Sequence, residues 1–259
     1  MSSFLTNLFK VFVVSHLVLQ LPAKSVPTYQ LEFENLPQRH RDEFYKHLVE
    51  AKRLFSQQRI FEALEVIAEA EKFIKEFPAL LSIKGACYVE FRDFDKAERL
   101  FKQSLALSPE SHGILFNLGE VHFVQSQWQA CQPYFQKVIK ALSDKPTDPT
   151  FLLAEFKNYI ADKKLKNTSA ANKVEAKYDF TCDAPIFYYI QAVKEMEAGK
   201  QAEGQKWLLS ARKVYKNPGQ LDAWYDCLVE AGYIKSFYGG GDRDSLYRPS
   251  KSKSSELSL

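Results

Sequence analysis

Small and large apolar residues recur along the chain with a period of 34 residues. Within each copy, the apolar positions follow the spacing of two amphipathic helices joined by a tight turn. Three positions mark the repeat: a small residue, a second small residue twelve positions later, and a large apolar residue four positions after that. In the first three copies these positions hold Ala51, Gly85 and Gly119, then Ala63, Ala97 and Cys131, then Ile67, Phe101 and Phe135.

The period is interrupted once, and we expect it to resume after a five-residue insertion around Pro146 to Thr150. The equivalent positions are then Asn158 and Ala192, Ala170 and Gly204, and Val174 and Leu208. A small residue on the first helix lets the second helix approach closely, and the large residue fills the space between them. One such pair cannot bury its apolar face alone, so the pairs must stack around a shared core. The pattern predicts an all-α fold.

The second copy, Pro78 to Ser111, resembles the tetratricopeptide repeat (TPR). The likeness is carried by Leu81, Gly85, Tyr88, Ala97, Phe101, Ser104 and Pro109. The third copy departs from the family pattern at His122 and Cys131, and the fourth is degenerate. The resemblance covers roughly residues 42 to 218 and implies a right-handed α-solenoid of about five helix pairs. The divergent repeats and the N-terminal sequence together also resemble uncharacterised envelope TPR proteins of Gram-negative bacteria.

The solenoid is expected to extend to residue 236 through one further helix within Gly219 to Ser236. Its apolar stripe could cover the exposed face of the last repeat, as a capping helix does. This stripe consists of Leu221, Trp224, Tyr225 and Leu228. Residues 237–259, with three successive glycines and a Ser/Lys-rich run, are expected to form a disordered tail. Residues 26–41 contain two prolines and are expected to be an extended lead-in.

Residues 1–25 have the composition of a signal peptide: one positive charge within residues 1–10, an apolar run over residues 11–21, and small residues before a cleavage point after Ser25. The run is shorter than the roughly 20 residues of a membrane-spanning helix. We therefore expect an exported, periplasmic or envelope-associated protein, with membrane contact only if this segment is retained. The alternatives are an uncleaved anchor and a cytoplasmic protein with an apolar N-terminal helix.

Charge and motifs argue against several other classes of protein. The 35 basic and 32 acidic residues leave a net charge of +3, which is too small to favour nucleic acid as a partner. The sequence has no zinc-like cysteine spacing, phosphate-binding loop or catalytic motif, so we expect no metal, no cofactor and no enzyme. We interpret the four cysteines as mostly buried small residues. The lysines from Lys163 to Lys177 alternate with acids and are interpreted as a solvated face.

In the TPR family, the first helix of each pair lines the concave surface on which partner peptides lie. Projecting the period onto this chain predicts an apolar, aromatic groove, which suits an amphipathic helix or an extended apolar peptide. The strongest candidates are Tyr45, Leu48, Lys52, Phe55, Phe116, Glu120, Phe123, Tyr159, Tyr189 and Val193. The same projection places Ala79, Ser82, Ala86, Val89, Leu152, Glu155, Asp162, Ile186 and Met196 in the groove. The alternative is that helix packing or the chain's own residues 26–41 bury these side chains.

The family's carboxylate-clamp members use basic and amide residues to hold a terminal carboxylate. Leu48, Ile83 and Gly113 stand at matching positions here and only Lys52 and Asn117 are polar, so a chaperone-tail adaptor is not expected. The sequence favours a non-enzymatic protein-interaction module whose partner is another protein or a peptide. The second hypothesis is a structural or assembly scaffold tethered in the bacterial envelope.

Overall fold

The computed structural model describes residues 27–235, and within this range every regular element is a helix. The predicted signal peptide and disordered tail lie outside the described residues. The elements are α1 (Thr28–Asn35), α2 (Gln38–Ser56), α3 (Ile60–Ala70), α4 (Pro78–Glu90), α5 (Phe94–Leu107), α6 (His112–Val124), α7 (Trp128–Ala141), α8 (Pro149–Lys164), α9 (Thr168–Lys177), α10 (Ile186–Glu197), α11 (Gln201–Val214), the short 3-10 turn η1 (Pro218–Gln220) and α12 (Asp222–Glu230).

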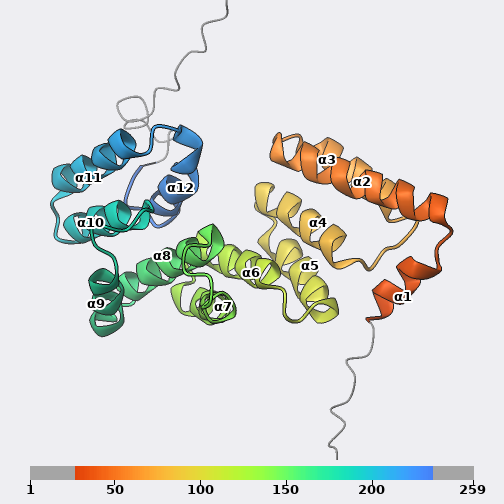
Figure 1. The fold of residues 1–259 in the computed structure, drawn as a ribbon, viewed down its shortest axis with the longest axis horizontal. Coiled ribbons are helices and arrows are strands. Elements are labelled where there is room, and N and C mark those ends of the chain that lie inside the picture. Colours follow the sequence, from red (N-terminus) through yellow and green to blue (C-terminus); the bar gives the residue numbers. More distant parts are fainter. Residues whose placement is uncertain (1–26, 236–259) are drawn as a thin grey trace, which may run out of the picture.

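Helices α2 to α11 form five consecutive pairs that stack along the molecule (Figure 1). The predicted all-α solenoid is therefore confirmed. Two prolines, Pro78 and Pro149, start the first helices of the second and fourth pairs, where a missing N–H leaves no hydrogen bond unmade. No helix between residues 27 and 235 has both the length and the apolarity that crossing a membrane requires.

The small and large residues of the repeat interlock as the sequence predicts. The ring of Phe101 on α5 lies against Gly85 on α4, and the ring of Phe135 on α7 lies against Gly119 on α6. A Cβ atom at Gly119 would come within 2.6 Å of the Phe135 ring, closer than carbon atoms can approach. Both phenylalanines are buried. The second and third helix pairs are thus each closed by an aromatic ring that fits only because the facing residue has no side chain.

The fourth repeat has a different register from the predicted one. The turn inside each helix pair has one residue with positive φ, and this residue marks the register. It recurs every 34 positions at Gln58, Arg92 and Ser126, but the next one, Lys166, follows Ser126 by 40 positions. The small positions of this repeat therefore fall on Tyr159 and Ala171, not on Asn158 and Ala170, and the large position falls on Glu175 in place of Val174. The packing is inverted here: the large ring comes from α8, and its hydroxyl donates a hydrogen bond to the Glu175 carboxylate at 3.0 Å.

The turns inside the first four pairs share one backbone feature. Gln58, Arg92, Ser126 and Lys166 each have φ close to +60°, in the left-handed region. Glycine takes this conformation readily, and it does so at the fifth turn with Gly199, but other residues are strained there by about 1–2 kcal/mol each. Packing of the two helices on either side must offset this strain.

Residues 26–41 are not the extended segment that their prolines suggested. The described part forms α1, a turn at Leu36–Pro37 and the first residues of α2. Phe33 of α1 packs against Phe44 and Phe77, with ring centroids 5.8 and 6.0 Å apart. Pro27 and Pro37 stand directly before the two helices, a position that proline tolerates because no helical N–H is lost there. The segment therefore covers the N-terminal end of the solenoid.

Replacing Gly119 with alanine should destabilise the protein, because the new methyl group displaces the buried Phe135 ring. Overpacking of this kind costs about 1–3 kcal/mol, more than the roughly 1 kcal/mol that alanine gains in a helix. Gly113→Ala on the same helix is the matched control, since a Cβ there meets nothing within 4 Å. Urea denaturation of both variants measures the difference. Equal stability of the two would show that the ring does not depend on the glycine.

Candidate peptide-binding groove

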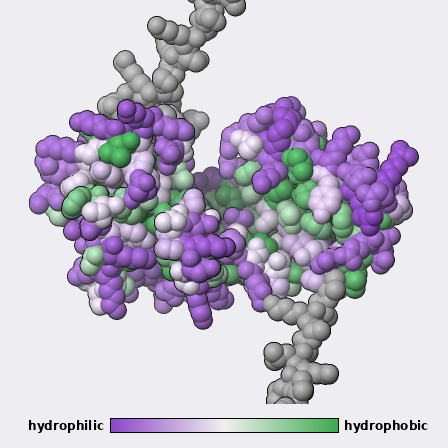
Figure 2. All heavy atoms as spheres, in the orientation of Figure 1, coloured by the Kyte–Doolittle hydropathy of each residue, from purple (hydrophilic) through white to green (hydrophobic). Residues whose placement is uncertain are grey.

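The open part of the concave surface lies on the first three repeats and is lined by α2, α4 and α6. Two adjoining hollows form it, and both include Asn117 of α6. One has a volume of about 370 Å³ and is lined by Pro78, Ala79, Ser82, Ser108, Ser111, Gly113, Ile114 and Asn117. The other has a volume of about 200 Å³ and is lined by Phe55, Ala86, Val89, Glu90, Phe101, Asn117 and Glu120. Figure 2 shows the molecule hollowed between its two halves, with hydrophobic residues at the base.

The structure brings together the residues that the period placed on the second repeat. Ala79 and Ser82 line the larger hollow, and Ala86 and Val89 line the smaller one. Phe55 from α2 and Glu120 from α6 complete the smaller hollow. These six side chains come from three different repeats, so the projection of a 34-residue period onto one face is correct for this part of the chain.

The other candidates on α2 and α6 lie outside the two hollows. Tyr45 and Lys52 are exposed, and Leu48 is half-buried. Tyr45 packs against Phe33 of α1, with ring centroids 4.9 Å apart. Phe116 is half-buried, and its ring meets Phe135 edge to face at 5.7 Å. These four residues therefore border the open groove or cover the core beside it.

Four predicted groove residues belong to the core instead. Phe123, Tyr159, Tyr189 and Val193 are all buried, with at most 2% of each residue exposed. Tyr159 was misplaced by the register of the fourth repeat, in which it takes the small position. Leu152, Glu155, Asp162, Ile186 and Met196, which the projection also placed in the groove, are buried too. The concave surface of the fourth and fifth repeats is therefore closed.

Helix α12 covers the concave surface of the fourth and fifth repeats. This helix lies on the inner side of α10 and α11 (Figure 1). Trp224 packs against Phe156 of α8 at 5.4 Å and Tyr189 of α10 at 5.8 Å between ring centroids. Leu221 and Leu228 of the predicted stripe are buried with it, as is Cys227, while Tyr225 of the stripe is half-buried. The capping helix is shorter than expected, Asp222–Glu230, and it covers both α8 and α10, where we expected only the last repeat.

A buried lysine joins α12 to the open groove. Lys157 of α8 is only 4% exposed, and its Nζ lies 2.7 Å from Glu120 Oε1 and 2.8 Å from Glu230 Oε2. Its ammonium group also lies 4.2 Å from the centroid of the Phe123 ring. Burial alone would lower the pKa of Lys157, but the surrounding negative groups, including both carboxylates, raise it well above its ordinary value. Lys157 is therefore charged and links α6, α8 and α12.

Sequence reasoning missed Lys157, which took no part in the predicted groove. The signal that could have found it is the true register of the fourth repeat, since Lys157 lies 40 residues after the groove residue Asn117. The predicted solvated face of lysines is also only partly correct. Lys163, Lys164 and Lys177 form ion pairs with Glu175, Glu197 and Glu155, and their side chains are between 21% and 44% exposed.

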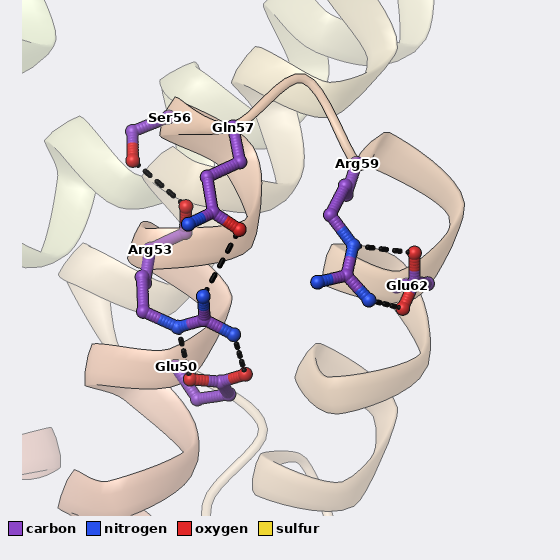
Figure 3. Close-up of polar contacts among 6 residues, drawn as sticks. All are labelled: Glu50, Arg53, Ser56, Gln57, Arg59 and Glu62. Atoms are coloured by element: carbon purple, nitrogen blue, oxygen red, sulfur yellow. Dashed lines mark hydrogen bonds and ion pairs between the residues drawn. The ribbon is translucent and has the colours of Figure 1, made fainter. Parts of the chain in front are cut away.

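The carboxylates of the groove differ from those on the outer surface. At the exposed α2–α3 turn, Glu50 accepts two hydrogen bonds from Arg53, and Arg59 binds Glu62 (Figure 3). These hydrogen bonds lower the pKa of both surface carboxyls. In the groove, partial burial raises the pKa of Glu90, and the charge of Asp226 raises it further. Burial also raises the pKa of Glu120, despite Lys157 beside it.

Comparison with solved structures supports the assignment of the fold. The structure is similar to PilW, a type IV pilus biogenesis factor (TM-score 0.53, 19% identity, 79% of this chain and 91% of that one). It is also similar to TTC0263, a thermophilic TPR protein of Thermus thermophilus (TM-score 0.50, 17% identity, 72% and 99%). A third similar structure is the apo form of the quorum sensor NprR from B. thuringiensis (TM-score 0.54, 9% identity, 80% and 64%). No family model and no curated protein sequence matches the chain.

These likenesses and the five stacked helix pairs show that the chain has the TPR fold. At identities below 20% they establish the fold and leave the partner to be inferred from the groove itself.

Replacing Lys157 with methionine should loosen α12, because Glu120 and Glu230 would then face each other without a cation. Removing one partner of a buried ionic group typically costs about 3–5 kcal/mol. Hydrogen exchange of residues 222–230 and urea denaturation measure the effect. Lys46→Met is the control, since this side chain is 75% exposed and the change should stay within about 0.5 kcal/mol. Unchanged protection of α12 in the Lys157 variant would contradict the assigned role.

Proposed function

We propose that this protein is a non-enzymatic interaction module that holds a peptide or a short helix of a partner protein in the open groove of its first three repeats. The observation that carries the proposal is the asymmetry of the concave surface. The chain's own α12 fills the groove along α8 and α10, while the hollows along α2, α4 and α6 have no occupant within residues 27–235.

The chemistry of the open groove supports a peptide as the guest. Its lining combines apolar side chains, such as Phe55 and Val89, with hydroxyl and amide groups from Ser82, Ser111 and Asn117. The apolar groups can cover side chains of a guest, and the polar groups can hydrogen-bond its backbone. Helix α12 shows how an apolar helix face can bind this surface. It packs on the next repeat along the same concave side, where its Trp224 and Leu228 are buried.

A photoreactive benzoylphenylalanine in place of Phe55 should crosslink to the partner in cells of the native host, because Phe55 lines the smaller hollow. The same group in place of Phe61, which is 74% exposed on α3 outside the groove, is the matched control and should give no such product. Adducts are compared on gels and identified by mass spectrometry.

A second change shows whether the adduct depends on the groove. Adding Ala86→Trp to the Phe55 derivative should abolish the product by filling the hollow, while Ala68→Trp on the exposed face of α3 should not. Thermal melting by circular dichroism checks that both variants fold. Equal crosslinking from positions 55 and 61, or an adduct that survives Ala86→Trp in a folded protein, would contradict a groove-bound guest.

Export is the second part of the proposal and rests on residues 1–25, whose composition matches a signal peptide. The protein isolated from its host should then begin at Val26, because cleavage follows Ser25. Mass spectrometry of the intact protein and of its N-terminal peptide measures this directly. A mature chain that still carries Met1 or the apolar run would contradict cleavage and would favour the tethered scaffold.

A further inference from the structure

The smaller hollow combines an apolar wall with carboxylates. Phe55 of α2 and Ala86 and Val89 of α4 provide the apolar part, and Glu90 and Glu120 provide the charge. Its volume of about 200 Å³ lies below the roughly 300–1,000 Å³ of sites for whole small molecules. The hollow therefore fits one long side chain better than a complete metabolite or a whole helix.

The local charge is negative and incompletely compensated. Lys157 is the cation beside this hollow, and its ammonium group already binds Glu120 and Glu230. Glu90 is exposed and forms no hydrogen bond or ion pair with any other residue from 27 to 235. Asp226 of α12 is close enough to act on the charge of both Glu90 and Glu120. Glu120 thus shares its ammonium partner with Glu230, and Glu90 has no cationic partner among the described residues.

Lys52 does not supply the missing positive charge. It is exposed on α2 and is not among the residues that line either hollow. A carboxylate clamp would need basic and amide side chains, and the sequence instead has Leu48, Ile83 and Gly113 at three of the clamp positions. An acidic guest would therefore meet repulsion from Glu90, whereas a basic guest would gain an ion pair that the free protein lacks.

Resting on the proposed function, we propose that the smaller hollow is a specificity pocket for a lysine or arginine side chain of the partner peptide. The aliphatic stem of the guest residue lies along Phe55 and Val89, and its cationic head reaches Glu90 beside Glu120. Lysine and arginine have this combination of a long apolar stem and a charged end. Asn117, which the two hollows share, then stands where the guest backbone passes into the serine-lined hollow.

Selection from a random dodecapeptide library displayed on phage tests this assignment on the full chain. Peptides that bind the wild-type protein should be enriched in lysine or arginine next to an apolar residue. A selected peptide should lose about tenfold or more in affinity on Glu90→Gln, the loss expected when a hydrogen bond to a charged group is removed. Glu65→Gln is the matched control, because Glu65 is an exposed carboxylate on α3 outside the groove and the change in net charge is the same.

The outcomes separate this pocket from the groove itself. Enriched peptides that lack basic residues but lose binding on Ala86→Trp would support the peptide-binding groove and contradict the pocket for a basic side chain. Enrichment that Ala86→Trp leaves unchanged, or no enrichment over the bare support, would overturn both. An equal loss on Glu65→Gln and Glu90→Gln would show general charge attraction and overturn the pocket. Self-association that Glu90→Gln abolishes would assign the hollow to a second copy of the chain, which also overturns it.

Discussion

The close fit of a phenylalanine ring onto a glycine holds the second and third pairs of helices together, and the shape of the open groove depends on it. Gly85 with Phe101 and Gly119 with Phe135 set how closely the two helices of a pair approach. That approach fixes the angle at which the next pair stacks, and the stacking forms the concave surface on which α2, α4 and α6 lie side by side. The shape of the groove thus depends on packing inside the helix pairs, and Phe101 takes part both in this packing and in the lining of the smaller hollow.

In the fourth repeat, a tyrosine replaces the glycine or alanine of the small position, and the helix pair is held together differently. With Tyr159 in the small position, α8 is held to α9 by a hydroxyl–carboxylate hydrogen bond and by the ion pair between Lys163 and Glu175. The helix is buried on almost every side, and it offers α12 a surface of Phe156 and Lys157. A degenerate repeat in the sequence is therefore the place where the fold closes its own groove.

The sequence predicted the helices, the interlocking residues of the second and third repeats, and six lining residues of the open groove. All of these depend on a strict 34-residue period, which local apolar spacing reveals. The prediction was wrong at Asn158, Ala170 and Val174, because an insertion can be located from sequence only to within a residue or so. One residue of error in a helix rotates the assigned face by about 100°, enough to exchange groove and core.

Other features could not be predicted because they arise between segments far apart in the chain. Nothing near Trp224 in the sequence indicates that it packs on Phe156 and Tyr189, and nothing near Lys157 indicates that it pairs with Glu230. The lead-in around Pro27 and Pro37 was misjudged for a different reason. Proline both breaks helices and stands readily before them, and the choice depends on the tertiary contacts of Phe33.

The hydrogen bond from Lys157 to Glu230 spans 73 residues of sequence, in a fold whose other pairings are mostly between neighbours along the chain. Repeat arrays usually fold and open piecewise, since each unit depends only on those beside it. Here a single apolar cluster runs from Leu115 to Ile234, while two smaller clusters serve the N-terminal repeats. The C-terminal half should therefore open as one cooperative body, with α12 among the last elements to settle during folding. The N-terminal repeats, whose apolar side chains form two smaller clusters, should open in smaller units.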